Sequence, residues 1–135
     1  MKANFLCVIL VMASFISVSG QKRNGLAIDG IFAGKPGVNG KTGGNYTVEE
    51  LRKSDWILFA ADTNFTVTEF KMSLVFKHAS SLPYAEYYIK GNTIPESYRD
   101  KILNQAAAVY LEYIQATNAR GVLMNVKPIA IRIQS

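Results

Sequence analysis

The sequence has very few of the residues that metal sites and nucleophilic catalysis most often use. It contains one cysteine, Cys7, and one histidine, His78, in 135 residues. Zinc and copper sites are built largely from cysteine and histidine, and thiol catalysis pairs a cysteine with a histidine. We therefore expect no metal, no cofactor and no Cys–His chemistry. A single cysteine also excludes a disulfide bond within the chain.

The chain also lacks a long hydrophobic run. Its most apolar stretch, Phe5–Ile16, is shorter than the roughly 20 residues that a transmembrane helix needs. Lys2 precedes it and the small residues Val18 and Gly20 follow, which is the pattern of a secretory signal. We expect residues 1–20 to be a signal peptide, with an uncleaved anchor as the alternative. The product would be exported, periplasmic or secreted, with no stable membrane span.

Neither sign of charge dominates strongly. Fifteen lysines and arginines against ten aspartates and glutamates give a net charge of +5, which favours solubility and does not identify a nucleic-acid binder. An anion- or glycan-binding module stays open as a minor alternative. Its basic residues would be Lys35, Lys41, Arg52 and Lys53.

Residues 34–43 are rich in glycine and contain Gly40, Lys41 and Thr42, which resemble the end of a phosphate-binding loop. That loop needs a glycine five residues before Gly40, where this chain has Lys35, and a helix directly afterwards, where it has two glycines. The segment is therefore interpreted as a surface loop.

What the chain has in abundance is short segments of alternating polarity. Large apolar side chains occupy every second position from Phe70 to Phe76, and isoleucines do so in the last strand, residues 129–133. This spacing places them on one face of a half-buried strand. Further strands are expected at residues 24–32, 55–62, 84–90 and 109–116, and a turn at Asn118–Gly121.

Two sequences fit the capping box that begins a helix. Thr47 with Glu50 predicts a short helical turn through Lys53, and Thr93 with Glu96 predicts the one good helix, extending to about Ala107. The expected fold is mainly β, an immunoglobulin-like antiparallel β-sandwich of six or seven strands with one short helix. Its parts would be a signal peptide (1–20), an N-terminal strand and glycine-rich loop (21–44) and the sandwich (45–135).

Catalysis has little support in the sequence, and we expect no enzyme. A small secreted hydrolase or inhibitor remains the alternative, using His78 beside Ser80 and Ser81 or a carboxylate pair. The candidate carboxylate pairs are Asp55 with Asp62 and Glu49 with Glu50.

Three tyrosines close together, Tyr84, Tyr87 and Tyr88, indicate a contact surface for another protein, because tyrosine joins a large apolar area to a polar tip. The alternative is that they are ordinary tyrosines of a strand. Arg120, in the expected turn, is the fourth candidate contact. A homodimer is a further expectation, and no nucleic-acid partner is expected.

Five segments in this order resemble a known family: GGNYTVEEL, FTVTEFKMSLVF, GNTIPESYRDKIL, VYLEYIQATNARG and KPIAIRI. The set is similar to the C-terminal periplasmic domain of GldM (PorM), a family of the Bacteroidetes gliding-motility and type IX secretion machinery. The resemblance covers about residues 43–133.

This resemblance implies an immunoglobulin-like β-domain without catalytic residues that docks to protein components of the cell envelope. Two departures matter. The chain lacks the long helical region and the preceding β-domains of the family, so it does not resemble the part that transmits force. The acidic turn usual in the last hairpin of the family is Asn118–Gly121 here, which weakens the argument for a contact at that tip.

Overall fold

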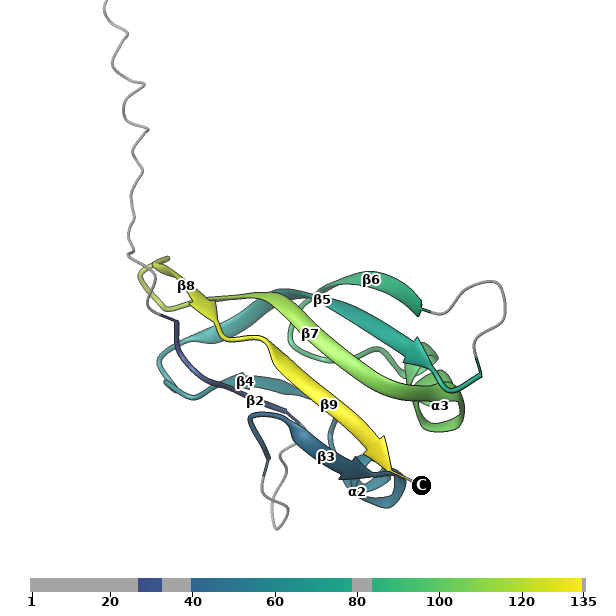
Figure 1. Ribbon diagram of the computed structural model, residues 1–135. Helices are drawn as coiled ribbons and strands as arrows, with labels where there is room; N and C mark the ends of the chain where they lie inside the picture. The colour runs from purple at the N-terminus through teal and green to yellow at the C-terminus, as the bar shows by residue number, and fades with distance from the viewer. Residues whose placement is uncertain (1–26, 33–39, 79–83, 135) are drawn as a thin grey trace, which may run out of the picture.

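The computed structural model describes residues 27–32, 40–78 and 84–134, which form two sheets and two helices (Figure 1). The expected signal peptide, most of the glycine-rich loop with Lys35, and the two serines at 80 and 81 lie outside these residues. The elements are β2 (Gly30–Phe32), β3 (Gly44–Thr47), α2 (Val48–Lys53), β4 (Leu58–Ala60), β5 (Thr66–Phe76), β6 (Tyr84–Lys90), α3 (Glu96–Gln105), β7 (Ala106–Thr117), β8 (Leu123–Val126) and β9 (Ile129–Gln134).

The larger sheet has six strands in the order β3-β9-β7-β5-β6, with β8 also paired to β7. Its pairs are antiparallel except one, since β3 runs parallel to β9. That parallel pair departs from the wholly antiparallel sheet expected from the sequence. A parallel pair needs a long crossover, and here nearly the whole domain lies between the two strands.

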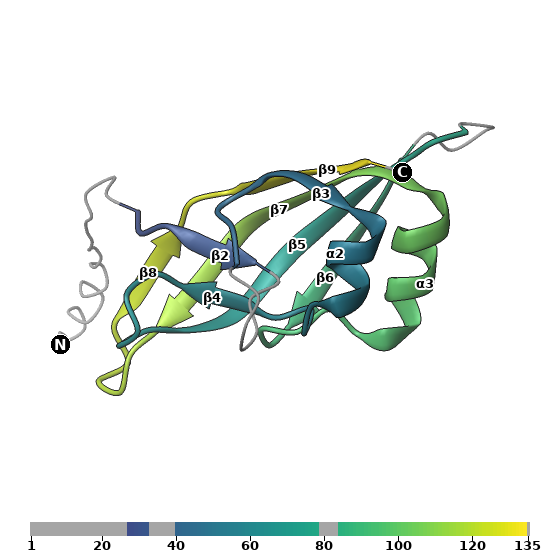
Figure 2. The ribbon, with the colours of Figure 1, turned by 90° about the horizontal axis from the view of Figure 1, so that it is seen from below.

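The second layer consists of the two-stranded sheet β2-β4 together with α2 and α3. In Figure 2, β9 and β3 run along the top of the picture and this second layer lies beneath them. Both layers contribute to one hydrophobic core. It contains Phe32, Leu51, Leu58, Ile94 and Ile102 from the second layer and its connections, and Phe70, Met72, Leu74, Val109, Leu111, Ile129 and Ile131 from the large sheet.

The alternating patterns are confirmed where they were strongest. Phe70, Met72 and Leu74 of β5 are at most 2% exposed, as are Ile129 and Ile131 of β9. The structure is mainly β, as predicted, although the described residues contain eight strands and two helices rather than six or seven strands and one helix.

The additional helix is α2, and it begins at the first of the two predicted capping boxes. The Glu50 amide donates to the Thr47 hydroxyl (3.0 Å) and the Thr47 amide donates to the Glu50 carboxylate (2.8 Å), so α2 begins at Val48. The other predicted capping box was wrong. Thr93 forms an isolated bridge with Ile57, and α3 begins three residues later without a side-chain cap.

Two expected strands are shorter than predicted. The segment 55–62 forms only β4, because Trp56 adopts a positive φ of 58° and interrupts the extended backbone. The segment 24–32 forms only β2, Gly30–Phe32, which pairs with β4. Both β2 and β3 are thus paired with strands of the rest of the domain. No helix in the described ranges is long and apolar enough to cross a membrane.

Candidate protein-contact surface

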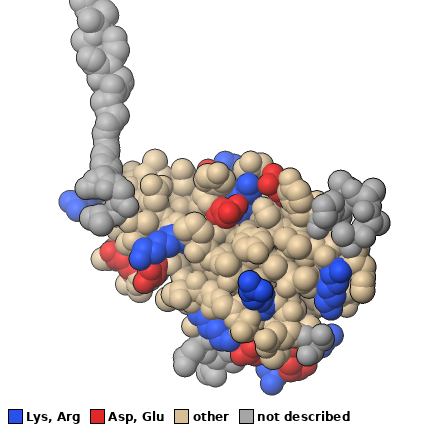
Figure 3. All heavy atoms as spheres, in the orientation of Figure 1, with Lys and Arg blue, Asp and Glu red and all other residues tan. Residues whose placement is uncertain are grey.

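The outer face of the six-stranded sheet, opposite the core, is not covered by any described helix or strand. Figure 1 views this face, and Figure 3 shows it as a mainly uncharged surface in the same orientation. Side chains alternate across a sheet, so every second residue of each strand points to this side. The surface is broad, and it carries aromatic rings.

Four tyrosines project from this face, and we call them the outer tyrosine face. Tyr88 is 79% exposed, Tyr113 74%, Tyr84 54% and Tyr110 38%. They come from β6 and β7, the two neighbours of β5. Exposed large apolar groups that are grouped on one face of a domain typically mark an interaction site.

Lys71 of β5 lies on the outer tyrosine face, between Tyr88 of β6 and Tyr113 of β7. It pairs across the sheet with Tyr88 on one side and with Glu112 on the other. Its ammonium lies 3.2 Å from Glu86 and 3.6 Å from Glu112, and only 12% of its side chain is exposed. The hydrogen bond to Glu86 and the surrounding negative charge raise the pKa of Lys71 above its usual value. Lys71 therefore keeps its positive charge and forms ion pairs with both neighbouring strands, β6 and β7.

Tyr113 reaches this face through a β-bulge. Lys71 pairs with Glu112 and Glu69 with Gln115, so β7 has one extra residue between these pairs. Tyr113 is that residue, with a positive φ of 50°, and its ring lies 5.2 Å from the Lys71 ammonium. A bulky residue in this region of φ is strained. The strained bulge places the exposed Tyr113 ring beside Lys71.

The predicted contact residues are divided between two faces. Tyr84 and Tyr88 belong to the exposed outer face, whereas Tyr87 is half-buried on the core side. The Tyr87 ring lies 4.5 Å from that of Tyr98 in α3, and Lys101 is 3.5 Å from its hydroxyl. Tyr87 therefore joins α3 to the sheet and is not an exposed contact, because adjacent strand residues point to opposite faces.

Arg120 lies at the exposed tip of the turn between β7 and β8. The Asn118 side chain accepts from the backbone amides of Arg120 and Val122, both at 3.0 Å, and Gly121 has the expected positive φ of 80°. Leu123, which begins β8, is 63% exposed. The predicted turn is confirmed, and its tip carries an arginine beside exposed aliphatic groups.

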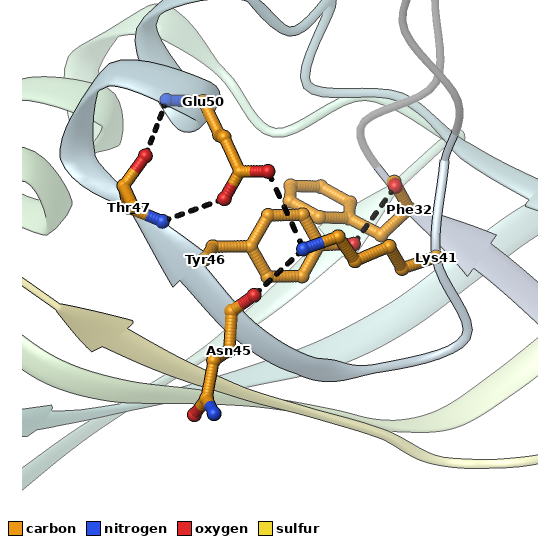
Figure 4. A network of polar contacts seen from close by, with 6 residues as sticks. All are labelled: Phe32, Lys41, Asn45, Tyr46, Thr47 and Glu50. Carbon is orange, nitrogen blue, oxygen red and sulfur yellow. Dashed lines mark hydrogen bonds and ion pairs between the residues drawn. The ribbon is translucent and has the colours of Figure 1, made fainter.

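Lys41, a candidate phosphate or glycan ligand, contacts other residues of the domain while 38% of its side chain remains exposed (Figure 4). Its ammonium donates to the Asn45 carbonyl at 2.7 Å, lies 3.4 Å from the Glu50 carboxylate and stacks 4.6 Å from the Tyr46 ring. The Tyr46 hydroxyl donates to the Phe32 carbonyl at 3.1 Å. This network joins β2, β3 and α2.

Of the other residues considered for catalysis or anion binding, Glu49, Glu50, Arg52 and Lys53 lie together in α2, whereas Asp62 and His78 lie elsewhere. Arg52 pairs with Glu49 at 3.5 Å, and Asp62 accepts from the Asn64 amide at 3.0 Å. His78 is exposed just after the end of β5. In the part of the chain that the structure describes, no three His, Cys, Asp or Glu side chains are grouped as metal ligands would be.

A small gap in the core is lined by apolar residues only: Phe32, Leu51, Trp56, Ile94, Ile102, Val109 and Ile131. It does not admit a water molecule. Catalytic and ligand-binding pockets combine an apolar wall with a few convergent polar groups. This gap is a packing feature of the interior.

Comparison of the chain with protein-family models finds no match, and comparison with curated proteins finds no significant one.

Tyr110 and Tyr113 were not predicted from the sequence as members of the outer tyrosine face, nor was the position of Lys71 between two of its tyrosines. Lys71 lies on the polar side of the clearest alternating segment, so its place on the outer face could have been read from the sequence. Tyr110 follows from the same alternation in residues 106–111. The position of Tyr113 depends on a bulge, for which the sequence contains no turn residue or glycine.

Proposed function

We propose that this protein is an exported, non-catalytic domain that binds another protein of the cell envelope through the outer tyrosine face. The observation that carries the proposal is the group of four exposed tyrosines on one uncovered sheet face. Protein interfaces are enriched in tyrosine at their centres, and a few aromatic residues supply most of their binding energy. The pattern 1–20 supports export, and the resemblance to the GldM C-terminal domain supports an envelope component as the partner.

An immunoglobulin-like sandwich is part of this proposal. In that fold the strands C, F and G form one sheet, and variable-type domains add C′ beside C. β5, β7 and β9 have the corresponding order, and β6 is in the position of C′. α3 lies in the chain where the strands D and E of the second sheet would be. The replaced strands leave the outer face of the large sheet unaltered as a docking surface.

The tyrosine face is pre-organised for binding. A cross-strand cluster of charges is formed by Lys71, Glu86 and Glu112. The left-handed backbone at Tyr113 sets the direction in which its side chain leaves the strand. Tyrosine has few rotatable bonds, so ordering it on binding costs less conformational entropy than ordering a long flexible side chain. Such a surface suits a specific partner of modest size.

The experiment is a pull-down from the native envelope fraction with the tagged full chain, followed by mass spectrometry. The double variant Tyr110→Thr/Tyr113→Gly removes two rings of the face. The matched control is Phe59→Thr, which removes an exposed ring from β4 in the other layer, where Phe59 is 42% exposed.

We expect the wild type and the control to retain the same envelope protein, and the double variant to retain at least about tenfold less, since each interface tyrosine contributes on the order of 1 kcal/mol or more. Equal recovery by all three proteins contradicts the proposed docking surface. Loss of the partner by the control alone would place the contact in the other layer.

A further inference from the structure

Among the residues that the structure describes, the strand β6 is a free edge of the large sheet. It pairs with β5 on one side, and no other described strand pairs with its second side. In Figure 1 it forms the upper margin of the domain. The opposite margin is different, because Ile28 bonds to the backbone of Asn125 and Lys127 beside β8 at 3.1 and 2.8 Å, and the short β3 covers β9.

Several of the usual protections of a free edge are missing from β6, although it carries the charged side chains Glu86 and Lys90. Natural proteins keep edge strands short, place charges on them, or interrupt them with proline, a bulge or a charge that points inward. β6 is seven residues long and has no proline, and its pairing with β5 is unbroken from Tyr84 to Lys90. Its inward side chains, Ala85, Tyr87 and Ile89, carry no charge. An edge of this kind is a template for another strand.

We propose that β6 pairs antiparallel with β6 of a second copy of this chain, so that two six-stranded sheets join into one. Closed two-fold dimers are the commonest homo-oligomers, and their contact is made by the same segment of both copies. A two-fold axis perpendicular to the sheet places the outer faces of both copies on the same side of the joined sheet. Residues that face each other in an antiparallel ladder point to the same side, so an odd-numbered residue faces an odd-numbered one and an even-numbered residue faces an even-numbered one.

The side chains of β6 select one register. With the axis at Tyr88, Glu86 faces Lys90 of the second copy, Lys90 faces Glu86 of the second copy, and the two copies of Tyr88 face each other. On the core side Tyr87 faces Ile89. Opposite charges and aromatic pairs directly across a ladder stabilise it, so each position is complementary.

The other registers are less favourable. An axis at Ile89 places Lys90 opposite Tyr88 and forms no ion pair. An axis at Glu86 places two glutamates opposite each other, which is destabilising. An axis at Tyr87 leaves Glu86 opposite Tyr88 and Lys90 opposite Tyr84, and forms no ion pair.

The selected register also extends a charge pattern that already crosses the sheet. Within one copy Glu112 and Glu86 flank Lys71, and Lys90 lies 2.8 Å from Glu69. Across the seam, Glu86 of one copy would meet Lys90 of the other. Positive and negative charges would then alternate from one sheet into the other. At the junction, Glu86 of each copy would lie between Lys71 of the same copy and Lys90 of the other copy.

The dimer is tested by measuring the mass of the full chain in solution over a range of concentrations. A single strand pair with its flanking side chains buries less surface than a standard stable interface, so we expect a Kd of about 10 µM. A wild type that stays monomeric well above this concentration overturns the proposal, even if a peptide or another protein can occupy the edge.

Two charge reversals identify the strand and its register. Glu86→Lys leaves lysines at both positions of each copy, and Lys90→Glu leaves glutamates at both, so each variant should lose self-association at least about tenfold through like charges facing each other. Mixed together, the two variants have opposite charges at both pairs in which position 86 of one copy faces position 90 of the other. We expect the mixture to form a one-to-one heterodimer.

Recovery of the dimer on mixing requires both variants to be folded, which separates loss of the interface from loss of structure. Variants that self-associate like the wild type, or a mixture that stays monomeric, contradict this dimer. The inference does not depend on the proposed envelope partner, because this test contains no other protein and leaves Tyr110 and Tyr113 unchanged.

Discussion

At the scale of single residues, Tyr113 is the most informative side chain. Its positive φ of 50° is unfavourable for any residue with a Cβ atom, yet its ring is 74% exposed and adds little to the core. A strained residue persists only when the surrounding structure holds it in place. Here the bulge and the cation–π contact with Lys71 do so.

The strain leads to an unusual prediction for stability. A protein with glycine at a strand position is normally less stable than the same protein with alanine there, by roughly 0.5–1 kcal/mol. At position 113 we expect the reverse, with Tyr113→Gly more stable than Tyr113→Ala by about 1 kcal/mol, because glycine removes the cost of the left-handed backbone. Urea denaturation of both variants measures the difference. The control is Tyr110 on the same strand, where the alanine variant should be the more stable one. A more stable alanine variant at both positions would argue against the bulge.

Tyr46 predicts how stability depends on pH. Burial raises the pKa of Tyr46 from 10.0 to about 12, and its hydroxyl donates to the Phe32 carbonyl. The folded state therefore holds this proton more tightly than the unfolded state. The contribution of the protonated Tyr46 hydroxyl to the free energy of unfolding is therefore fully present below pH 10 and is lost as the pH rises through 12.

The variant Tyr46→Phe has no such proton, and comparing it with the wild type isolates the effect of this one group. We expect the difference in unfolding free energy between the two proteins to be constant below pH 10. It should then change by about 2 kcal/mol by pH 12, against the wild type. Denaturation curves at a series of pH values measure it. A difference that does not vary with pH would show that the Tyr46 hydroxyl is not held as described.

At the scale of elements, the two capping-box sequences have different outcomes. Thr47 and Glu50 form reciprocal bonds at the start of α2, whereas Thr93 lies in an extended bridge before Pro95 and caps nothing. We expect Thr47→Ala to lower the unfolding free energy by about 1 kcal/mol, the usual effect of losing a cap. Thr93→Ala should change it by less than about 0.5 kcal/mol. Chemical denaturation measures both, and equal losses would contradict the difference between the two helix starts.

These elements also show what the sequence could predict. The strands β5, β6 and β9 were predictable because their polarity alternates with the period of a strand and one face is buried. The bounds of β4 and α3 were not, since they depend on the left-handed backbone at Trp56 and on the bridge between Thr93 and Ile57. Both are tertiary effects that override a local motif.

The candidate contact surface was predictable only in part, for a related reason. The cluster Tyr84, Tyr87 and Tyr88 drew attention to β6, but adjacent tyrosines of one strand cannot share a face. Tyr110 and Tyr113 join the surface from β7, far along the chain. Only the register of β5 with its two neighbours brings the four exposed rings together.

At the scale of the whole molecule, the two layers have separate roles. The helices and the small sheet bury one face of the large sheet, and no described helix or strand covers the other face, which is the docking surface that we propose (Figure 2). The free edge at β6 adds a second, perpendicular direction in which the sheet can grow. A dimer joined at this edge would double the outer tyrosine face without covering Tyr110 or Tyr113.

Site-specific photo-crosslinking shows which face of the domain contacts another protein. A benzoylphenylalanine at position 113 reports on the outer tyrosine face, and the same residue at position 59 reports on the opposite layer; both positions normally hold exposed aromatic rings. After irradiation in the native envelope, we predict a discrete adduct with one envelope protein from position 113 and none from position 59. An adduct from position 59 alone, or none from either position, would contradict the assignment of the outer tyrosine face as the docking surface.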